Sequence, residues 1–120
     1  MCQLDNKTLL IDIGNSAVKW LFDGDYHSIS VDEFNVDALP KAQQTFVSCV
    51  GDKLLLNGLK NTTFVETQAT FNAFKSAYKD ADELGVDRFL AMIAAIDRYP
   101  NQTRLIVDAG SALTFDLILA

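Results

Sequence analysis

The chain has 120 residues, of which 49% are hydrophobic and 22% charged, and its formal net charge is −6. The length corresponds to one domain, the composition argues against disorder, and the acidity argues against a general nucleic-acid or anionic-membrane surface. No apolar run reaches about 18 residues, so no membrane-spanning helix is predicted. The first residues lack the layout of a secretion signal, and Cys2 and Cys49 lack metal-ligand spacing. We therefore expect a reducing, cytoplasmic setting.

The order of elements along the chain predicts an α/β fold with a mixed sheet. Apolar, β-prone runs between turn residues predict strands at residues 8–13, 17–22, 26–31, 45–50, 63–67, 103–107 and 113–119. A helix is predicted over residues 86–99, because apolar side chains recur there at helical spacing and Pro100 follows. The remaining segments predict a loop or short helix at 32–44, a short helix at 51–59, and irregular structure with some helix at 71–84.

Two matching segments of the sequence have the residues of phosphate-binding turns. Residues 9–16 and 105–112 are each an apolar run that ends in Asp-x-Gly, followed by small polar or apolar residues. Glycine lets backbone N–H groups approach an anion, the Asp can hold a metal-bound water, and hydroxyl or amide side chains can bind phosphate oxygens. The pair therefore predicts two loops that face one nucleotide.

The last predicted strand, residues 113–119, is strongly apolar and is followed by no turn, cap or polar tail. A strand of this kind normally lies inside a sheet, where its neighbours cover it. We expect residues 1–100 to form one domain and residues 101–120 to begin a second domain that is truncated here. The alternative is a small domain whose last strand pairs at an edge or across a dimer.

Three blocks of the sequence resemble the signature blocks of type III pantothenate kinases, the Baf family, in the same order. They are residues 12–19 (DIGNSAVK), 84–88 (LGVDR) and 108–114 (DAGSALT), and the resemblance runs from about Leu9 to the end of the chain. It implies ATP-dependent phosphorylation of pantothenate, the first step of coenzyme A biosynthesis. It also implies a homodimer of ribonuclease-H-like domains (the actin and sugar-kinase superfold), Mg²⁺ with the nucleotide, and a monovalent cation, K⁺ or NH₄⁺.

The first block is expected to bind ATP through Asp12, Ile13, Gly14, Asn15, Ser16, Ala17, Val18 and Lys19. Gly14 frees the backbone for the turn, and Asn15 and Ser16 offer hydrogen-bond donors to phosphate oxygens. Asp12 would orient Mg²⁺ through water, and Lys19 would reach a phosphate as a point charge. The alternative for this block alone is an ordinary hairpin turn.

The other two blocks imply the remaining site residues. By resemblance, Asp87 is the general base that takes the proton of the substrate hydroxyl, and Arg88 pairs with the pantothenate carboxylate. The pantothenate site is expected to be formed by Tyr78, Gly85, Val86, Asp87 and Arg88. The alternative for the second block is a helix start with Asp87 as a dipole partner and Arg88 as a surface charge.

In the third block, Asp108 matches the family's monovalent-cation position, and Ser111 matches a nucleotide-binding position that is usually Thr. The change to Ser keeps the hydroxyl, so function is expected to survive. The roles of Thr114 and Asp116 stay open.

Two other functions stay open beside the kinase. One is a non-catalytic, Baf-type regulatory or nucleotide-binding relative, and the other is an inactive fragment of the kinase. The acidic charge argues against direct DNA binding. The resemblance implies pantothenate and a second copy of the protein as partners, and the acidic composition predicts that neither nucleic acid nor a membrane is among them.

Overall fold

A computed structural model describes residues 7–120, so Cys2 and the residues examined for a secretion signal lie outside the described part. Contacts divide the chain into two compact units, one up to Val65 and one from Glu66 onward. This division does not coincide with the expected domain boundary after residue 100. That boundary concerns the whole protein and stays a prediction.

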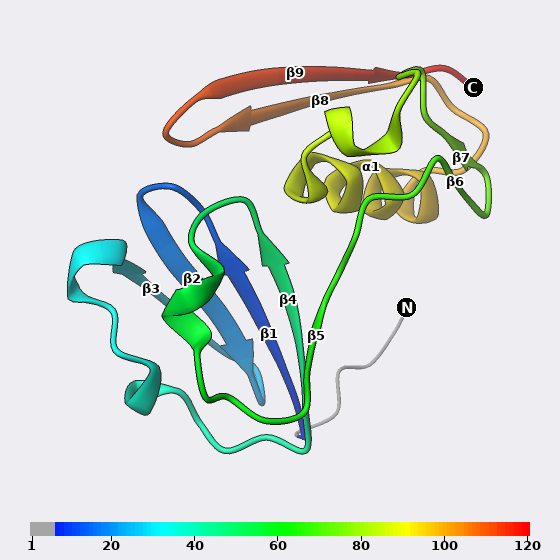
Figure 1. Ribbon diagram of the computed structural model, residues 1–120. Helices are drawn as coiled ribbons and strands as arrows, with labels where there is room; N and C mark the ends of the chain where they lie inside the picture. The colour runs from blue at the N-terminus through cyan, green and yellow to red at the C-terminus, as the bar shows by residue number, and fades with distance from the viewer. Residues whose placement is uncertain (1–6) are drawn as a thin grey trace. The chain divides into compact units, whose positions relative to one another are not determined.

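The first unit is built on a mixed five-stranded sheet (Figure 1). Its strands are β1 (Thr8–Ile13), β2 (Ala17–Phe22), β3 (Asp25–Ser30), β4 (Gln44–Cys49) and β5 (Thr62–Phe64). The spatial order is β3-β2-β1-β4-β5. β1, β2 and β3 pair antiparallel as a meander, whereas β4 runs parallel to both β1 and β5. The sheet therefore places the β1–β2 turn at the carboxyl end of β1, beside the carboxyl end of β4.

One face of this sheet carries the hydrophobic core of the unit. Side chains alternate between the two faces of a strand, and Leu9, Ile11 and Ile13 of β1 are all buried. The core is completed by Val18, Trp20, Val47 and Leu56. The segments that follow β3 and β4 form short 3₁₀ helices, and partly buried apolar side chains from these segments pack against the core. Burial on this face fixes the register of β1 and hence the position of the turn that follows it.

The second unit contains one helix and two small hairpins. Its elements are β6 (Thr70–Phe71), β7 (Phe74–Lys75), a 3₁₀ turn (Ala81–Glu83), α1 (Val86–Arg98), β8 (Arg104–Ala109) and β9 (Leu113–Ile118). β6 pairs with β7, β8 pairs with β9, and the β8–β9 hairpin packs along α1 (Figure 1). Within residues 7–120, no helix is long and apolar enough to cross a membrane.

The buried face of α1 holds this unit together. Val86, Phe89 and Met92 are buried on it at helical spacing. The Phe89 ring meets Phe74 edge-on, with centroids 5.2 Å apart, and Phe71 at 6.5 Å. These contacts fix the first turn of α1 against the β6–β7 hairpin.

The predicted α/β class, the mixed sheet and the helix are confirmed. β1 and β2 have the predicted bounds, and the other predicted elements differ by a few residues at their ends. The short helix predicted at 51–59 is a 3₁₀ turn over Lys53–Leu56, and the strand predicted at 63–67 ends at Phe64. The β6–β7 hairpin was not predicted, because strands of two residues each have no detectable alternation.

Candidate functional site

The first Asp-x-Gly segment forms a tight turn between β1 and β2. The backbone N–H of Gly14 donates to the carbonyl of Ala17 at 2.9 Å and closes the turn. Asn15 and Ser16 are exposed at its tip. The exposed backbone and side-chain donors at this tip have the character of an anion-binding loop.

Asp12 lies in β1, two residues before Gly14, and its neighbours on the two adjacent strands are polar. It is paired with Lys19 on β2 and with Ser48 on β4. Residues paired in this way point to the same face of a sheet. The hydroxyl of Ser48 is buried and has no hydrogen-bond partner among residues 7–120.

Carboxylate and hydroxyl oxygens suit Mg²⁺, which usually takes only one or two protein carboxylates together with water and phosphates. Residues 7–120 contain no group of three or more His, Cys, Asp or Glu that could hold a metal ion alone. The donor set of Asp12 and Ser48 therefore fits a nucleotide-bound Mg²⁺ better than a resident metal.

Gly51, just after β4, supports the first turn, although it belongs to none of the three signature blocks. A Cβ on Gly51 would lie 2.4 Å from the carbonyl oxygen of Gly14. In addition, the N–H of Val50 donates to the carbonyl of Ile13 at 2.9 Å. The absence of a side chain at Gly51 therefore lets the chain after β4 pack directly against the turn.

The Gly85–Arg88 block begins α1, as predicted. Gly85 is the N-cap residue, and its carbonyl accepts the N–H of Phe89 at 3.0 Å. Val86 is buried and anchors the turn, whereas Asp87 is half-buried and accepts the backbone N–H of Arg88 at 2.8 Å. Because a carboxylate has several lone pairs, Asp87 can accept a further hydrogen bond from another donor.

Arg88 reaches from α1 to Asp116 on β9. Its Nε donates to Oδ2 of Asp116 at 2.9 Å, and its Nη2 donates to Oδ1. Nη2 also donates to the hydroxyl oxygen of Tyr78 at 3.4 Å. The hydrogen bond with Asp116 is the main cause that raises the pKa of Arg88 above its ordinary value. Arg88 is therefore held in an ion pair, and its expected contact with the pantothenate carboxylate stays a prediction.

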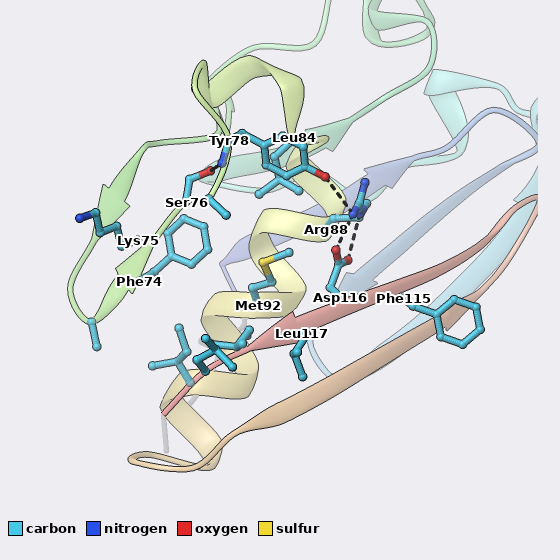
Figure 2. Close-up of a pocket in the computed structure, with 15 residues that line it drawn as sticks. Phe74, Lys75, Ser76, Tyr78, Leu84, Arg88, Met92, Phe115, Asp116 and Leu117 are labelled. Atoms are coloured by element: carbon cyan, nitrogen blue, oxygen red, sulfur yellow. Dashed lines mark hydrogen bonds and ion pairs between the residues drawn. The ribbon is translucent and has the colours of Figure 1, made fainter.

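Arg88, Tyr78 and Asp116 line a pocket in the second unit, with a volume of about 470 Å³. Figure 2 shows Arg88 joined to Asp116 by dashed lines, whereas the Phe115 side chain points away from the cavity. The other walls are largely apolar and include Phe74, Leu84, Met92, Ile96 and Ile118. An apolar cavity with a few converging polar groups is the usual form of a small-molecule site.

The second Asp-x-Gly segment forms the turn between β8 and β9. The N–H of Gly110 donates to the carbonyl of Ala112 at 3.0 Å, and Ser111 is exposed in the turn. Asp108 is exposed and is paired with Thr114 across the ladder. The Thr114 hydroxyl is buried without a hydrogen-bond partner among the described residues. An unsatisfied hydroxyl next to a carboxylate is a donor set that fits a hard cation.

The predicted residues fall into two groups. Residues 12–19 are together in the first unit, and Tyr78, residues 85–88, Asp108 and Ser111 are in the second. Four further residues with site-like features were assigned no role from the sequence, namely Ser48, Gly51, Thr114 and Asp116. Of these, only Asp116 gave a signal, as a carboxylate at the inward position of an apolar strand.

The sequence and the fold both match known proteins. The family described as type III pantothenate kinase matches residues 8–120. A type III pantothenate kinase from Pseudoalteromonas translucida is 33% identical over 120 residues, covering 92% of this chain and 50% of the relative. The one from Colwellia psychrerythraea is 34% identical over 127 residues, covering 92% and 51%.

A solved structure is similar as well. It is the crystal structure of a Campylobacter jejuni protein described as a Baf family transcriptional activator, which matches with a TM-score of 0.61 and 33% identity. The match covers 92% of this chain and 48% of that one. The chain spans about half the length of the curated relatives it matches. On the family match over residues 8–120 and these identities, the chain belongs to the type III pantothenate kinase family.

Proposed function

We propose that the complete protein transfers the γ-phosphoryl group of ATP to pantothenate, giving 4'-phosphopantothenate at the start of coenzyme A biosynthesis. One observation carries this proposal. In a chain of this family, the Gly85–Arg88 block forms the first turn of α1 and places Arg88 beside Tyr78 in a pocket of small-molecule size. The pocket, the proposed base Asp87 and the proposed carboxylate-binding Arg88 thus all belong to the second unit.

Asp87 is the proposed general base for the substrate hydroxyl. Its fixed hydrogen bond to the N–H of Arg88 orients the carboxylate at the N-terminus of α1. Phosphoryl transfer passes through a loose transition state, in which the attacking hydroxyl has lost little of its proton. A well-oriented Asp can therefore serve even though its basicity is low.

Arg88 is the proposed partner of the pantothenate carboxylate, because its planar fork can bind a carboxylate through two hydrogen bonds. Tyr78 lines the same pocket. Gly85 and Val86 shape the backbone next to these side chains. The apolar walls of the pocket suit the uncharged part of the substrate.

Residues 12–19 and Ser111 are the proposed nucleotide contacts. Asn15 and Ser16 donate to phosphate oxygens, and Lys19 balances their charge. Asp12 and Ser48 would hold the Mg²⁺ that accompanies ATP, and this ion supplies charge neutralisation at the phosphates. Asp108 and Thr114 would hold the monovalent cation, K⁺ or NH₄⁺.

The finer assignments of fold and assembly belong to this proposal. The order β3-β2-β1-β4-β5, with three antiparallel strands followed by parallel ones, supports a ribonuclease-H-like first domain. The β8–β9 hairpin would open a second such domain, and the complete protein would act as a homodimer in the cytoplasm, where ATP is available.

A regulatory role is the second candidate, since the Campylobacter jejuni relative is described as a transcriptional activator. A net charge of −6 speaks against direct binding to DNA. Retardation of promoter DNA by the complete protein at physiological salt, without kinase activity, would favour this candidate.

The kinase proposal is tested by assaying the complete natural protein with ATP, Mg²⁺, K⁺ and pantothenate. The variant Asp87→Asn keeps the oxygen that accepts the N–H of Arg88, so we expect an unchanged melting temperature and a loss of kcat of about 100-fold or more. Asp97→Asn, at the exposed end of α1, is the matched control and should keep full activity. An active Asp87→Asn variant would refute the assignment of the base.

A further inference from the structure

The two partners of the ion pair between Arg88 and Asp116 differ in solvent exposure. The Asp116 side chain is only 8% exposed, whereas that of Arg88 is 26% exposed and lines the pocket. The buried partner is thus the one that is fixed, on the ladder of β9 opposite Ile106. The arginine is the partner that reaches into the cavity.

The guanidinium of Arg88 has two edges with hydrogen-bond donors, and they face different partners. Asp116 takes the side edge of the group, formed by Nε and Nη2. The end edge, formed by Nη1 and the other hydrogen of Nη2, is the one on which Nη2 meets the Tyr78 hydroxyl. Among residues 7–120, no hydrogen bond engages Nη1. The end edge thus carries only one long contact, from Nη2 to Tyr78 at 3.4 Å, and a planar anion that bonds to Nη1 can replace Tyr78 at Nη2.

We propose that Asp116 is a positioning residue, which holds the side edge of Arg88 so that its end edge receives the carboxylate of the substrate. This inference rests on the proposed function, in which Arg88 binds the pantothenate carboxylate. A long arginine side chain loses rotamer freedom when it is fixed. Asp116 fixes Arg88 before the substrate arrives, so part of that cost falls on folding rather than on binding.

Asp116 also sets the charge that the substrate meets. The pair is neutral as a unit, so a carboxylate at the end edge is recognised by the fork geometry more than by net positive charge. The two possible roles of Asp116 have opposite consequences when its charge is removed. If Asp116 only balanced charge, its loss would strengthen binding of an anion. If it positions Arg88, its loss weakens binding.

The test is calorimetric titration of the complete natural protein with pantothenate and with pantothenol, which has an alcohol in place of the carboxylate. We expect Asp116→Asn to raise the pantothenate Kd by about tenfold, as for other residues that orient a ligand-binding side chain. The amide of Asn presents a donor to one of the two N–H groups of Arg88, so the fork is released. The pantothenol Kd should change by less than about twofold.

Two further variants separate this role from a structural one. Asp116→Glu keeps the charge but displaces the carboxylate, and it should also raise the pantothenate Kd. Ile106→Ala removes packing next to Asp116 without touching the ion pair, so it should lower the melting temperature while leaving the pantothenate Kd unchanged. A pantothenate Kd that Asp116→Asn lowers or leaves unchanged overturns the inference, as does an equal rise for pantothenol.

The titrations also separate this inference from the proposed function. If the wild-type protein binds pantothenate without phosphorylating it, the kinase proposal fails, and the Asp116 variants still decide the positioning role. If the wild-type protein does not bind pantothenate, both fail. If it is an active kinase and Asp116→Asn binds normally, only the positioning role fails.

Discussion

The carboxylate of Asp116 on β9 holds the guanidinium of Arg88 on α1 through two of its nitrogen atoms, across 28 residues of sequence. This ion pair joins the β8–β9 hairpin to the helix that carries Asp87. The hydrogen bond with Asp116 also raises the pKa of Arg88 above its ordinary value. One contact therefore links the stability of the second unit to the polar end of the pocket.

Removal of Arg88 should destabilise the protein, because it leaves the nearly buried carboxylate of Asp116 unpaired. We expect Arg88→Met to lower the free energy of unfolding by roughly 2 kcal/mol, a value reduced by the partial exposure of the pair. The double variant Arg88→Met/Asp116→Leu should recover most of this loss, since it buries no lone charge.

Urea denaturation followed by circular dichroism measures these differences. Arg98→Met, near the exposed end of the same helix, is the control and should change the free energy by less than about 0.5 kcal/mol. Equal destabilisation by Arg88→Met and by the double variant would show that the charge of Asp116 is solvated without its partner.

The local signals in the sequence predicted the elements that build the site. The apolar, β-prone runs at residues 8–13 and 17–22, separated by the Gly14–Ser16 turn, predicted the bounds of β1 and β2. The helical period and Pro100 likewise predicted α1. The residues of the signature blocks therefore lie on elements that were predicted.

The supporting contacts could not be predicted, because they depend on tertiary packing. Nothing near Asp116 in the sequence indicates that its strand lies along α1 and meets Arg88. The need for glycine at position 51 depends on how closely the chain approaches Gly14. The hairpin of β6 and β7 turns at Asn72, whose φ of 50° is a left-handed conformation with only a weak signature in the sequence.

Substitution of Gly51 should disturb the β1–β2 turn, because the new Cβ would lie 2.4 Å from the carbonyl oxygen of Gly14. Backbone must move to relieve this contact, so we expect Gly51→Ala to cost about 1–3 kcal/mol of stability. It should also raise the KM for ATP, since residues 12–19 include the displaced turn. Gly110→Ala is the control for stability, because a Cβ there meets nothing within 4 Å. Two equally stable variants would contradict the close approach of Gly51 to the turn.

The buried hydroxyl of Thr114 gives a test of the cation site. Thr114→Val keeps the shape of the side chain and removes an oxygen that has no hydrogen-bond partner among residues 7–120. Stability measured without K⁺ should therefore stay the same or rise by up to about 1 kcal/mol. If the oxygen binds the cation, the K⁺ concentration for half-maximal activity rises by about fivefold.

Titration of kinase activity with KCl, at constant ionic strength, measures this concentration. Thr70→Val, an exposed threonine of β6 in the same unit, is the matched control and should leave it unchanged. An unchanged K⁺ requirement in Thr114→Val would remove Thr114 from the proposed cation site and leave Asp108 as its only assigned ligand.

The thiol of Cys49 should react slowly, although it lies at the end of β4. Burial is the main cause that raises the pKa of Cys49 above its ordinary value, and its Sγ donates to the carbonyl of Gly51 at 3.5 Å. Since the thiolate is the reactive form, alkylation by iodoacetamide at pH 8 should be at least about tenfold slower in the folded protein than in urea. The raised pKa also means that the unfolded chain loses its thiol proton first, so this group's contribution to stability falls as the pH rises above the ordinary thiol pKa. Peptide mass spectrometry separates Cys49 from Cys2 and follows the rate between pH 7 and pH 10. Equal rates in the folded and unfolded protein at every pH would show that the thiol is neither buried nor shifted.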